Sequence, residues 1–349
     1  MGWYAFLLYP FAAIYDLVTR LRNLFFDLGW KNSERSKIPS IVVGNLSVGG
    51  TGKTPMVEFL IQKFKDDLKL AVLSRGYGRK SKGFLAANQD STPELIGDEP
   101  FQIFQKFREE IPVFVGEDRL AAIDKIYFRA NRPHLLILDD AFQHRYVIGD
   151  VSVLLTTYQK PFFSDYLLPM GRLRESRRGA KRTDIVVVTK CPKELPETRK
   201  SELIKGIERY LLRGTPIVFS YISYGAQFCL VGKFPFSSQI ILLTGLADDK
   251  PLVEYVSEKF TLLETVSYPD HHDYSLDDFE KIKSIYQKHL QSYPVILTTE
   301  KDAVKVKSNA PKGFLKEIPI FVLPIAFAMS TSDQNLLEEL LQQKVFNIG

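Results

Sequence analysis

Cysteine is scarce in this chain, and so are long apolar or basic runs. Only two of the 349 residues are cysteines, Cys191 and Cys229, and their wide separation fits no metal-binding pattern. No apolar run reaches the roughly 20 residues that a membrane-spanning helix needs. Lys and Arg number 46 against 41 for Asp and Glu, with no long basic block, so we expect no nucleic-acid partner. Together these scarcities predict a cytosolic protein without disulfides.

The composition is otherwise that of an ordinary folded protein with a sizeable core. Apolar residues make up 45% of the chain and charged residues 25%, close to the average for soluble domains. The length predicts one large domain or two ordinary ones. The net charge of +5 suits a substrate or a membrane surface that carries phosphate. Nothing in the sequence indicates an obligate protein partner.

The first 30 residues depart from this average. Residues 3–14 are apolar apart from the tyrosines and Pro10, and leucine and aromatic side chains continue to Trp30. Arg20, Arg22 and Lys31 lie near these aromatics, a pattern typical of a helix in the membrane interface. An amphipathic helix packed on the core is the alternative. We favour membrane contact, because exposed Trp, Tyr and Phe side chains are rarely tolerated otherwise.

Short apolar runs recur along the chain and are separated by polar segments of helix length. Near-continuous apolar runs of this kind are typical of parallel strands that are buried on both faces. Their alternation with helices predicts an α/β fold with a doubly wound, mostly parallel sheet of the P-loop NTPase type and a smaller second α/β domain. The runs are residues 41–43, 70–73, 113–115, 135–138, 151–155 and 185–188, then 216–221, 240–243, 295–297 and 318–323.

These elements suggest four segments. We expect a membrane-associated helix at 1–30, a core α/β domain at 31–217, a hairpin-like linker at 218–230 and a C-terminal α/β domain at 231–349. The polar, turn-rich residues 81–98 predict a long loop.

A glycine-rich loop follows the first apolar run. It consists of residues 47–54, namely Ser47, Val48, Gly49, Gly50, Thr51, Gly52, Lys53 and Thr54. Its glycines let backbone amides turn toward phosphate oxygens. Lys53 would reach the β- and γ-phosphates, Thr54 would bind Mg²⁺, and the next helix would direct its positive N-terminus at the phosphates. The usual first glycine is Ser47 here, but the order strand, loop and helix predicts a true P-loop.

A second apolar strand, residues 135–138, ends in Asp139 and Asp140. A carboxylate at such a strand end usually holds Mg²⁺ directly or through water. A pair of turn-forming aspartates is the alternative. Residues 189–192 stand where guanine-specific relatives carry an Asn-Lys-x-Asp element, but the terminal aspartate is missing. ATP is therefore favoured over GTP.

Other polar clusters follow predicted strands or open helices, and each has a structural alternative. Residues 75–79 would contact phosphate or form a tight turn. Residues 97–100 would supply a base and a metal ligand, or an N-cap with a first-turn acid. The basic run that starts at 171 suits an anionic head group or a solvated surface. The histidine pair at 271–272 suits proton handling better than zinc. Strand carboxyl ends share one sheet edge, so these pieces would converge on a single crevice.

The whole pattern resembles the tetraacyldisaccharide 4′-kinase family, the lipid A 4′-kinases of Gram-negative bacteria. The resemblance covers nearly the whole chain, and Ser47 is normal within this family. The P-loop alone is unspecific, whereas the ordered set of motifs is highly specific. It comprises the apolar N-terminus and residues 44–54, 74–79, 97–100, 139–144, 171–175, 270–272 and 299–304.

The resemblance implies ATP-dependent phosphorylation of the 4′-hydroxyl of a tetraacylated glucosamine disaccharide 1-phosphate, which gives lipid IVA. It also implies a peripheral place on the cytoplasmic face of the inner membrane. Asp98 would be the general base, oriented or tuned by His271, with His272 as the alternative match, and Lys53 would act on the transferred group. Mg²⁺ would be surrounded by Thr54, Glu99, Asp139 and Asp140. The nucleotide or substrate site would also include Tyr77, Arg119, Gln143 and Arg172. The match at 299–304 implies no role.

Two other functions remain as alternatives. A membrane-associated switch ATPase or GTPase would hydrolyse nucleotide with a protein partner. Dimeric ATPases of the related P-loop branch carry a lysine where this chain has Val48, which argues against that function. A nucleotide-binding scaffold without catalysis is disfavoured by the presence of both Lys53 and the aspartate pair.

Overall fold

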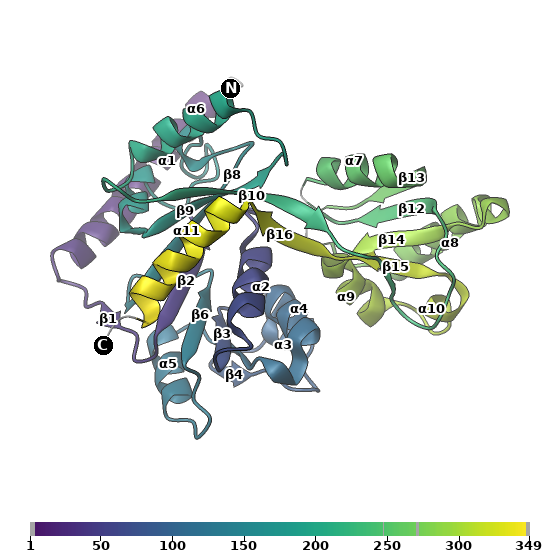
Figure 1. The fold of residues 1–349 in the computed structure, drawn as a ribbon, viewed down its shortest axis with the longest axis horizontal. Coiled ribbons are helices and arrows are strands. Elements are labelled where there is room, and N and C mark those ends of the chain that lie inside the picture. Colours follow the sequence, from purple (N-terminus) through teal and green to yellow (C-terminus); the bar gives the residue numbers. More distant parts are fainter. Residues whose placement is uncertain (1–3, 247, 270–271, 347–349) are drawn as a thin grey trace. The chain divides into compact units, whose positions relative to one another are not determined.

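The computed structural model describes residues 4–246, 248–269 and 272–346. The chain forms two compact units (Figure 1). Met1–Ile222 and Phe327–Gly349 make up the first unit, and Ser223–Ala326 make up the second. Each unit has its own sheet and its own core, and each is described here by itself.

The first unit is built on a mostly parallel sheet. Its central strands are parallel and buried along their whole length, and the short edge strand β4 is antiparallel to its neighbour β5. In the described part of the chain the sheet has nine strands. In sheet order they are β16 (Ile325–Met329), β10 (Ile217–Tyr224), β9 (Ile185–Cys191), β8 (Val151–Thr157), β2 (Ser40–Asn45), β6 (Leu135–Asp139), β3 (Leu70–Ser74), β5 (Val113–Val115) and β4 (Leu85–Ala86).

Helices cover both faces of this sheet, because side chains alternate along each strand. Ile41 and Val43 of β2 face one cluster of buried residues, and Val42 faces another. The first cluster includes residues of α2 (Lys53–Phe64), α4 (Asp98–Phe107) and α11 (Thr331–Leu341). The opposite face is covered by α5 (Arg119–Tyr127) and α6 (Glu197–Glu208). The expected doubly wound α/β fold is confirmed.

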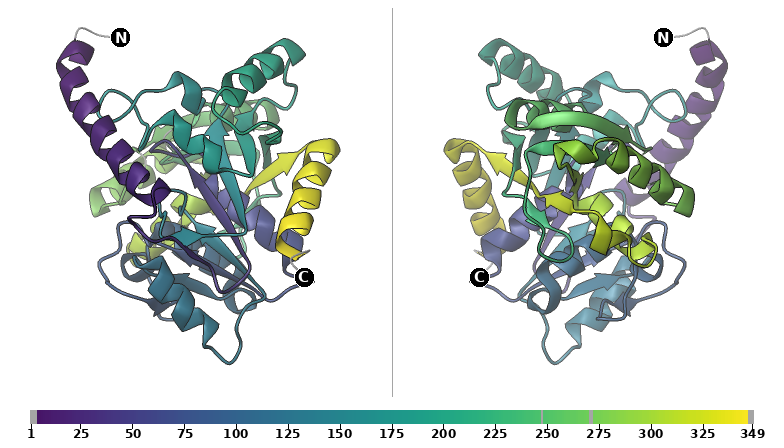
Figure 2. Two further views of the ribbon diagram at one scale, coloured as in Figure 1. Left: turned by 90° about the vertical axis from the view of Figure 1, so that its left-hand side faces the viewer. Right: turned by 90° about the vertical axis from the view of Figure 1, so that its right-hand side faces the viewer.

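Helix α1 (Tyr4–Asp27) lies on the outside of the first unit (Figure 2). Its buried residues include Ala12 and Phe26, and the Phe26 ring packs edge-on against Tyr146 at 4.9 Å. Among the described residues no helix is long and apolar enough to cross a bilayer. A two-stranded parallel sheet of β1 (Glu34–Arg35) and β7 (Val147–Ile148) follows α1. The remaining short elements of this unit are α3 (Pro93–Ile96), η1 (Arg108–Glu110), η2 (Phe162–Ser164), η3 (Arg177–Arg182) and η5 (Gln342–Phe346).

The second unit repeats the three-layer plan on a smaller scale. Its sheet order is β11 (Phe228–Cys229), β15 (Ile320–Leu323), β14 (Val295–Thr299), β12 (Gln239–Thr244) and β13 (Thr261–Ser267). All pairs except the one between β11 and β15 are parallel. One face is covered by α7 (Lys250–Lys259). The other face carries α8 (Leu276–Lys288), α9 (Glu300–Asn309) and α10 (Phe314–Glu317), and the short turn η4 (Leu290–Ser292) follows α8.

The structure divides the chain differently from the predicted boundaries. The expected hairpin at 218–230 does not form, because β10 pairs with β9 while β11 pairs with β15. The chain also returns to the first unit at Phe327, where Leu337 and Leu341 of α11 join the core beside α2. The predicted loop at 81–98 contains β4 and α3.

Candidate active site

The P-loop, residues 47–54, is held from three directions. Asn45 Nδ2, at the end of β2, donates to Thr51 Oγ1 at 2.6 Å. Thr189 Oγ1, near the end of β9, donates to the Thr51 carbonyl oxygen at 2.8 Å. The Val48 amide donates to the Arg172 carbonyl oxygen at 2.7 Å. The loop conformation is therefore built into the protein before any ligand contributes to it.

Two glycines turn the P-loop into the start of α2. Gly49 has φ of 101° and Gly52 has φ of 86°, values that favour glycine because a Cβ would be strained there. Gly52 is the N-cap of α2, and no side chain in the described part of the chain caps this helix end. The first amides of α2 can therefore act on an anion, and the helix dipole favours the same charge.

Lys53 and Asp140 meet at the centre of this region. Lys53 is 8% exposed, and its Nζ lies 3.7 Å from Asp140 Oδ1. Arg174 Nη1 lies 3.1 Å from both oxygens of the same carboxylate. Burial acts to raise the pKa of Asp140, but Lys53 and Arg174 outweigh it and hold the pKa below its usual value. Asp140 has φ of 47°, a conformation that is uncommon outside glycine and concentrates at functional sites.

Asp139, the last residue of β6, is completely buried. Its Oδ2 accepts a hydrogen bond from Ser74 Oγ at 3.0 Å, while no group in the described chain donates to Oδ1. Burial and then the charge of Glu99 raise the pKa of Asp139 to about 7, although Lys53 acts in the opposite direction. A buried carboxylate oxygen without a donor is the kind of group that a cation stabilises.

The residues expected around Mg²⁺ fit that ion chemically but do not form a cage. Thr54, Glu99, Asp139 and Asp140 offer only oxygen ligands, the type that Mg²⁺ prefers. Among the described residues no group of three or more His, Cys, Asp or Glu side chains is arranged to hold a metal ion. Mg²⁺ is usually bound by one or two carboxylates together with substrate phosphates. The Oδ1 atom of Asp139 and the Thr54 hydroxyl beside the P-loop lysine match such a shared site.

Two glycines bring the turn at 75–79 against the start of α4. A Cβ on Gly97 would lie 3.1 Å from the Gly76 backbone, and a Cβ on Gly76 would lie 2.7 Å from the Ile96 carbonyl oxygen. Gly97 is the N-cap of α4, and Asp98 and Glu99 lie in its first turn, so neither carboxylate of this segment is the N-cap that the structural alternative would require. Tyr77 is 81% exposed on this turn. The glycine contact thus places Asp98 beside a loop with an accessible aromatic ring.

Arg119 is buried rather than directed to the surface. It is 1% exposed, and its guanidinium donates to the carbonyl oxygens of Gly116 and Asp139. Burial lowers its pKa to about 10, and Asp139 and Asp140 act to raise it. The guanidinium thus links the loop after β5 to the end of β6 by hydrogen bonds. Its positive charge lies close to the aspartate pair.

Gln143 and Arg172 support the P-loop in this structure. Gln143 Nε2 donates to the Asn45 carbonyl oxygen at 2.6 Å. Arg172 accepts from the P-loop through its backbone, and its side chain pairs with Asp165 at 2.8 Å. Arg174 also belongs to this site, but the sequence predicted no role for it. The high density of arginine after residue 171 was a possible indication, yet such a density is also typical of a solvated surface.

Glu175 and Thr189 complete the supporting network. Both lie inside motifs of the sequence, 171–175 and 189–192, but the sequence predicts no role for either residue. Glu175 is 4% exposed and accepts from Arg182 Nη2 at 2.9 and 3.0 Å. A buried acid is rare unless it is paired, yet burial cannot be read from the sequence around it.

The predicted histidine site is only partly described. His271 lies outside the described residues, as does Asp270. His272 belongs to the second unit, where its Nε2 lies 2.9 Å from Asp278 Oδ2 and its ring stacks on Tyr268 at 4.4 Å. Asp278 also forms the capping box of α8 with Ser275. The His272 ring is thus engaged within its own unit.

The motif at 299–304 stabilises the second unit. Thr299 is the N-cap of α9, and its hydroxyl donates to the buried carboxylate of Asp302 at 2.9 Å. The Gly245 amide, just after β12, donates to the same carboxylate at 3.1 Å. A Cβ on Gly245 would lie 2.7 Å from Asp302 Oδ1. The motif therefore connects the carboxyl ends of β12 and β14.

Comparison with known proteins agrees with this geometry. The family model described as tetraacyldisaccharide-1-P 4′-kinase matches residues 4–345. A protein named tetraacyldisaccharide 4′-kinase from Flavobacterium johnsoniae is 40% identical over 341 residues, which cover 96% of both chains. A protein of the same name from Cytophaga hutchinsonii is 38% identical over 339 residues, covering 95% of this chain and 93% of the relative.

The fold is also similar to that of a solved structure. The crystal structure of LpxK from Aquifex aeolicus, described as an "apo" form in complex with ATP, superposes with a TM-score of 0.75 at 27% sequence identity. The match covers 98% of this chain and 99% of that one. The resemblance that the ordered motifs indicated is confirmed.

Proposed function

The chain belongs to the tetraacyldisaccharide-1-P 4′-kinase family, and we propose that it transfers the γ-phosphoryl group of ATP to the 4′-hydroxyl of tetraacyldisaccharide 1-phosphate, giving lipid IVA. One observation carries the proposal: a preformed P-loop beside an aspartate pair lies within a chain that matches this family over residues 4–345. Phosphoryl transfer needs positioning and charge neutralisation more than covalent catalysis, and these residues supply both.

ATP would take its place at the P-loop through amides and one cation. The uncapped N-terminus of α2 and the amides of the glycine-rich loop would bind the phosphates. Lys53 would exchange part of its interaction with Asp140 for the β- and γ-phosphate oxygens. Arg174 would continue to hold Asp140, so this carboxylate would keep a partner when the lysine moves.

We assign the Mg²⁺ that accompanies ATP to the Thr54 hydroxyl and the Asp139 carboxylate, with Glu99 and Asp140 nearby. When bound, the ion would neutralise charge on the phosphate oxygens. This role requires Asp139 to be deprotonated. Burial disfavours the negative charge, and a cation at Oδ1 would stabilise it.

Asp98 would accept the proton of the sugar hydroxyl. It lies in the first turn of α4, next to the positive N-terminus of that helix. The family resemblance pairs this base with His271, which would hold charge or orient the carboxylate. Tyr77 would contact the nucleotide or the substrate from its exposed turn, while Arg119, Gln143 and Arg172 would act by shaping the site.

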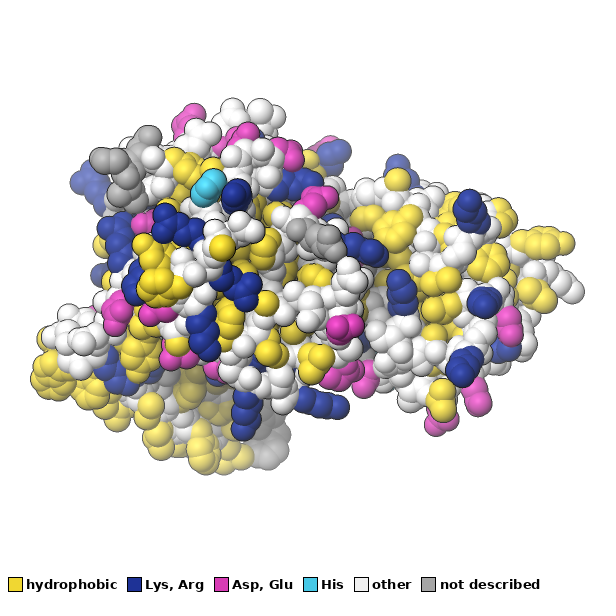
Figure 3. Space-filling model, turned by 90° about the horizontal axis from the view of Figure 1, so that it is seen from below, with side chains coloured by type: hydrophobic (Ala, Val, Ile, Leu, Met, Phe, Trp, Pro, Cys, Tyr) yellow, Lys and Arg dark blue, Asp and Glu magenta, His cyan; other side chains and the backbone are white. Residues whose placement is uncertain are grey.

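The protein would work from the surface of the inner membrane, on its cytoplasmic face. Along α1 an apolar stripe is exposed at a spacing that keeps it on one side of the helix: Leu7, Phe11, Ile14, Val18 and Leu21. Figure 3 shows hydrophobic side chains along the lower left edge, where α1 lies, with Lys and Arg side chains close by. Such a stripe would let the acyl chains of the substrate stay in the bilayer.

The test is transfer of labelled phosphate from ATP to purified tetraacyldisaccharide 1-phosphate in detergent micelles. The wild-type protein should form the 4′-phosphorylated lipid, and Lys53→Ala should not. Asp98→Asn should lower turnover while it leaves ATP binding largely intact. Absence of product from the wild type, or undiminished product from Lys53→Ala, would refute the proposed function.

A further inference from the structure

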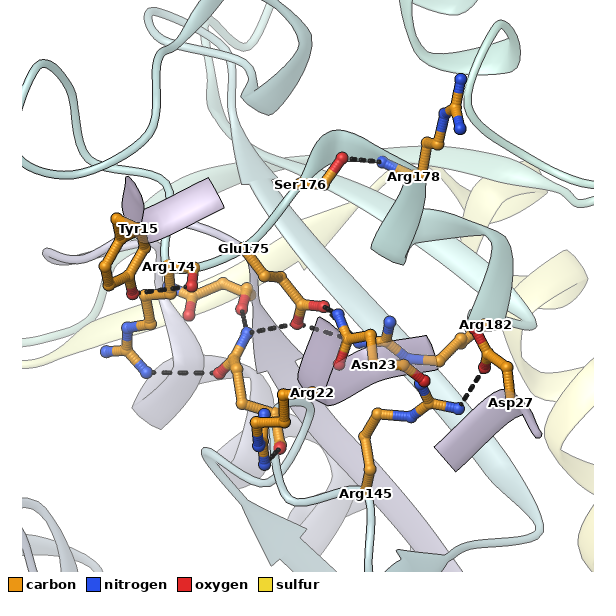
Figure 4. Close-up of polar contacts among 12 residues, drawn as sticks. Tyr15, Arg22, Asn23, Asp27, Arg145, Arg174, Glu175, Ser176, Arg178 and Arg182 are labelled. Carbon is orange, nitrogen blue, oxygen red and sulfur yellow. Dashed lines mark hydrogen bonds and ion pairs between the residues drawn. The ribbon is translucent and has the colours of Figure 1, made fainter. Parts of the chain in front are cut away.

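Helix α1 forms hydrogen bonds with segments that lie beside the P-loop. Three of its side chains reach residues more than 120 positions away in the sequence (Figure 4). Tyr15 Oη donates to the Arg174 carbonyl oxygen at 2.8 Å. Asn23 Nδ2 donates to Glu175 Oε2 at 3.0 Å. Arg22 Nη2 donates to the Gln143 carbonyl oxygen at 2.9 Å.

The three acceptors lie in the segments that support the P-loop. The Arg174 amide donates to the Leu46 carbonyl oxygen at 2.7 Å, and a β-bridge joins Leu173 to Ser47. The Gln143 side chain donates to the Asn45 carbonyl oxygen at 2.6 Å. Arg174 and Gln143 are therefore hydrogen-bonded directly to residues 45–46, just before the P-loop, and Glu175 is connected to them through Gln143.

Glu175 is the point at which these contacts meet. Its buried carboxylate accepts from Asn23, from Arg182, and from Gln143 Nε2 at 3.3 Å. Gly179 passes so close that a Cβ there would lie 2.7 Å from Glu175 Oε2. A buried carboxylate depends on its donors, so removing one of them affects the others.

Arg174 carries the connection to the charged centre. Its carbonyl oxygen is held by Tyr15, and its guanidinium holds Asp140, which pairs with Lys53 at 3.7 Å. A shift of this residue would therefore move a cation relative to the aspartate beside the P-loop lysine.

We propose that α1 is a structural part of the nucleotide site, and that Tyr15 and Asn23 are positioning residues which fix Arg174 and Glu175 and, through them, the P-loop and Asp140. This role is additional to membrane contact, because the residues of the apolar stripe are exposed while Tyr15 and Asn23 are half-buried. The inference rests on the proposed function only in that the P-loop binds ATP.

The experiment measures the affinity of the full-length protein for a fluorescent ATP analogue in detergent micelles. Tyr15→Phe removes one hydroxyl and keeps the ring, and Asn23→Ala removes the donor to Glu175. Each change should lower the affinity for the analogue about 2- to 10-fold, the effect of one lost hydrogen bond. Asn23→Asp should lower this affinity further, because it places a second carboxylate against Glu175.

The matched control is Thr19→Val. It removes a hydroxyl whose hydrogen bond, to the Asp16 carbonyl oxygen, stays inside α1. The affinity of this variant for the analogue should stay within about twofold of wild type, a smaller change than the loss of one hydrogen bond produces. Thermal unfolding of every variant shows whether the fold is intact.

Unchanged affinity in Tyr15→Phe and Asn23→Ala, with or without a fall in melting temperature, would overturn the inference and leave these residues a purely structural role. An equal loss in Thr19→Val would overturn it as well. The readout needs no lipid acceptor. A wild-type protein that binds the analogue but phosphorylates no lipid would therefore contradict the proposed function and not this inference.

Discussion

The Lys53 ammonium lies 3.7 Å from the Asp140 carboxylate, at the point where the P-loop meets the end of β6. Both side chains are largely buried, so water screens their attraction weakly. The ion pair holds the Lys53 ammonium beside Asp140, and Arg174 contacts the same carboxylate. We propose that the phosphates of ATP would replace Asp140 as the partner of Lys53.

This relationship predicts that Asp140→Asn separates nucleotide binding from transfer. Removing a negative charge beside the phosphates should leave metal-free ATP binding unchanged or tighter. Transfer should fall by about 10²- to 10³-fold, as when one preorganised electrostatic group is removed from an active site. ATP affinity in chelator and turnover in the acceptor assay give the two numbers. Undiminished turnover would show that Asp140 is not part of the reacting centre.

Asp139 predicts a pH dependence of stability. Its pKa rises from 3.8 to about 7 on folding, so the folded protein binds this proton more tightly than the unfolded chain does. This acid therefore lowers the free energy of unfolding as pH rises from about 4 to about 7. Asp139→Asn should lack that decline. At about pH 8 it should be more stable than wild type by about 1–3 kcal/mol, the usual cost of an unsatisfied buried polar group.

Thermal or urea unfolding of nucleotide-free protein at about pH 5 and about pH 8 provides the measurement. Asp277→Asn is the control, because Asp277 is an exposed aspartate of the second unit. Parallel pH profiles for wild type and Asp139→Asn would contradict the raised pKa. The same variant should lose phosphoryl transfer, which would show that the buried acid costs stability for the sake of function.

The exposed stripe of α1 predicts graded membrane binding. Replacing Phe11 or Ile14 by Ser removes apolar area worth about 1–2 kcal/mol, so each change should weaken binding to vesicles about 5- to 30-fold. Ala13→Ser, at an exposed position of the same helix, should have little effect. Flotation with vesicles of anionic and neutral lipid measures this directly. Equal flotation of all variants would show that α1 does not carry membrane contact.

The Asp302 network predicts a destabilised second unit. Asp302→Ala removes a buried acceptor of the Gly245 amide and the Thr299 hydroxyl. The free energy of unfolding should fall by about 1–3 kcal/mol, because both donors are left without this partner. Affinity for an ATP analogue should persist, since the P-loop belongs to the first unit. A loss of nucleotide affinity at unchanged stability would require a different role for the motif.

The parts that could be predicted from the sequence are those governed by local pattern. Apolar runs in the sequence predict the buried parallel strands, including β2 and β6. The positions of the glycines and of Lys53 predict the P-loop. The same logic failed where pairing is non-local. Residues 218–230 alternate like a hairpin, yet β10 and β11 belong to different sheets, because partners elsewhere in the chain supply their hydrogen bonds.

Arg174 escaped prediction for a related reason. An arginine in a basic run is typical of a solvated surface, and only the fold shows that Arg174 reaches Asp140. Arg119 was expected in the site, but its burial against the Asp139 carbonyl oxygen could not be predicted from the sequence. The return of α11 to the first core likewise depends on packing against α2, which no local pattern specifies.

The central claim is that this P-loop serves a kinase rather than a nucleotide switch. The most direct measurement is the ratio of phosphorylated lipid to ADP formed by the purified protein with ATP and tetraacyldisaccharide 1-phosphate in micelles. The account predicts about one lipid phosphorylated at the 4′ position per ADP, as the stoichiometry of phosphoryl transfer requires, and no product from Lys53→Ala. ADP release without lipid product, accelerated by a protein partner, would contradict it.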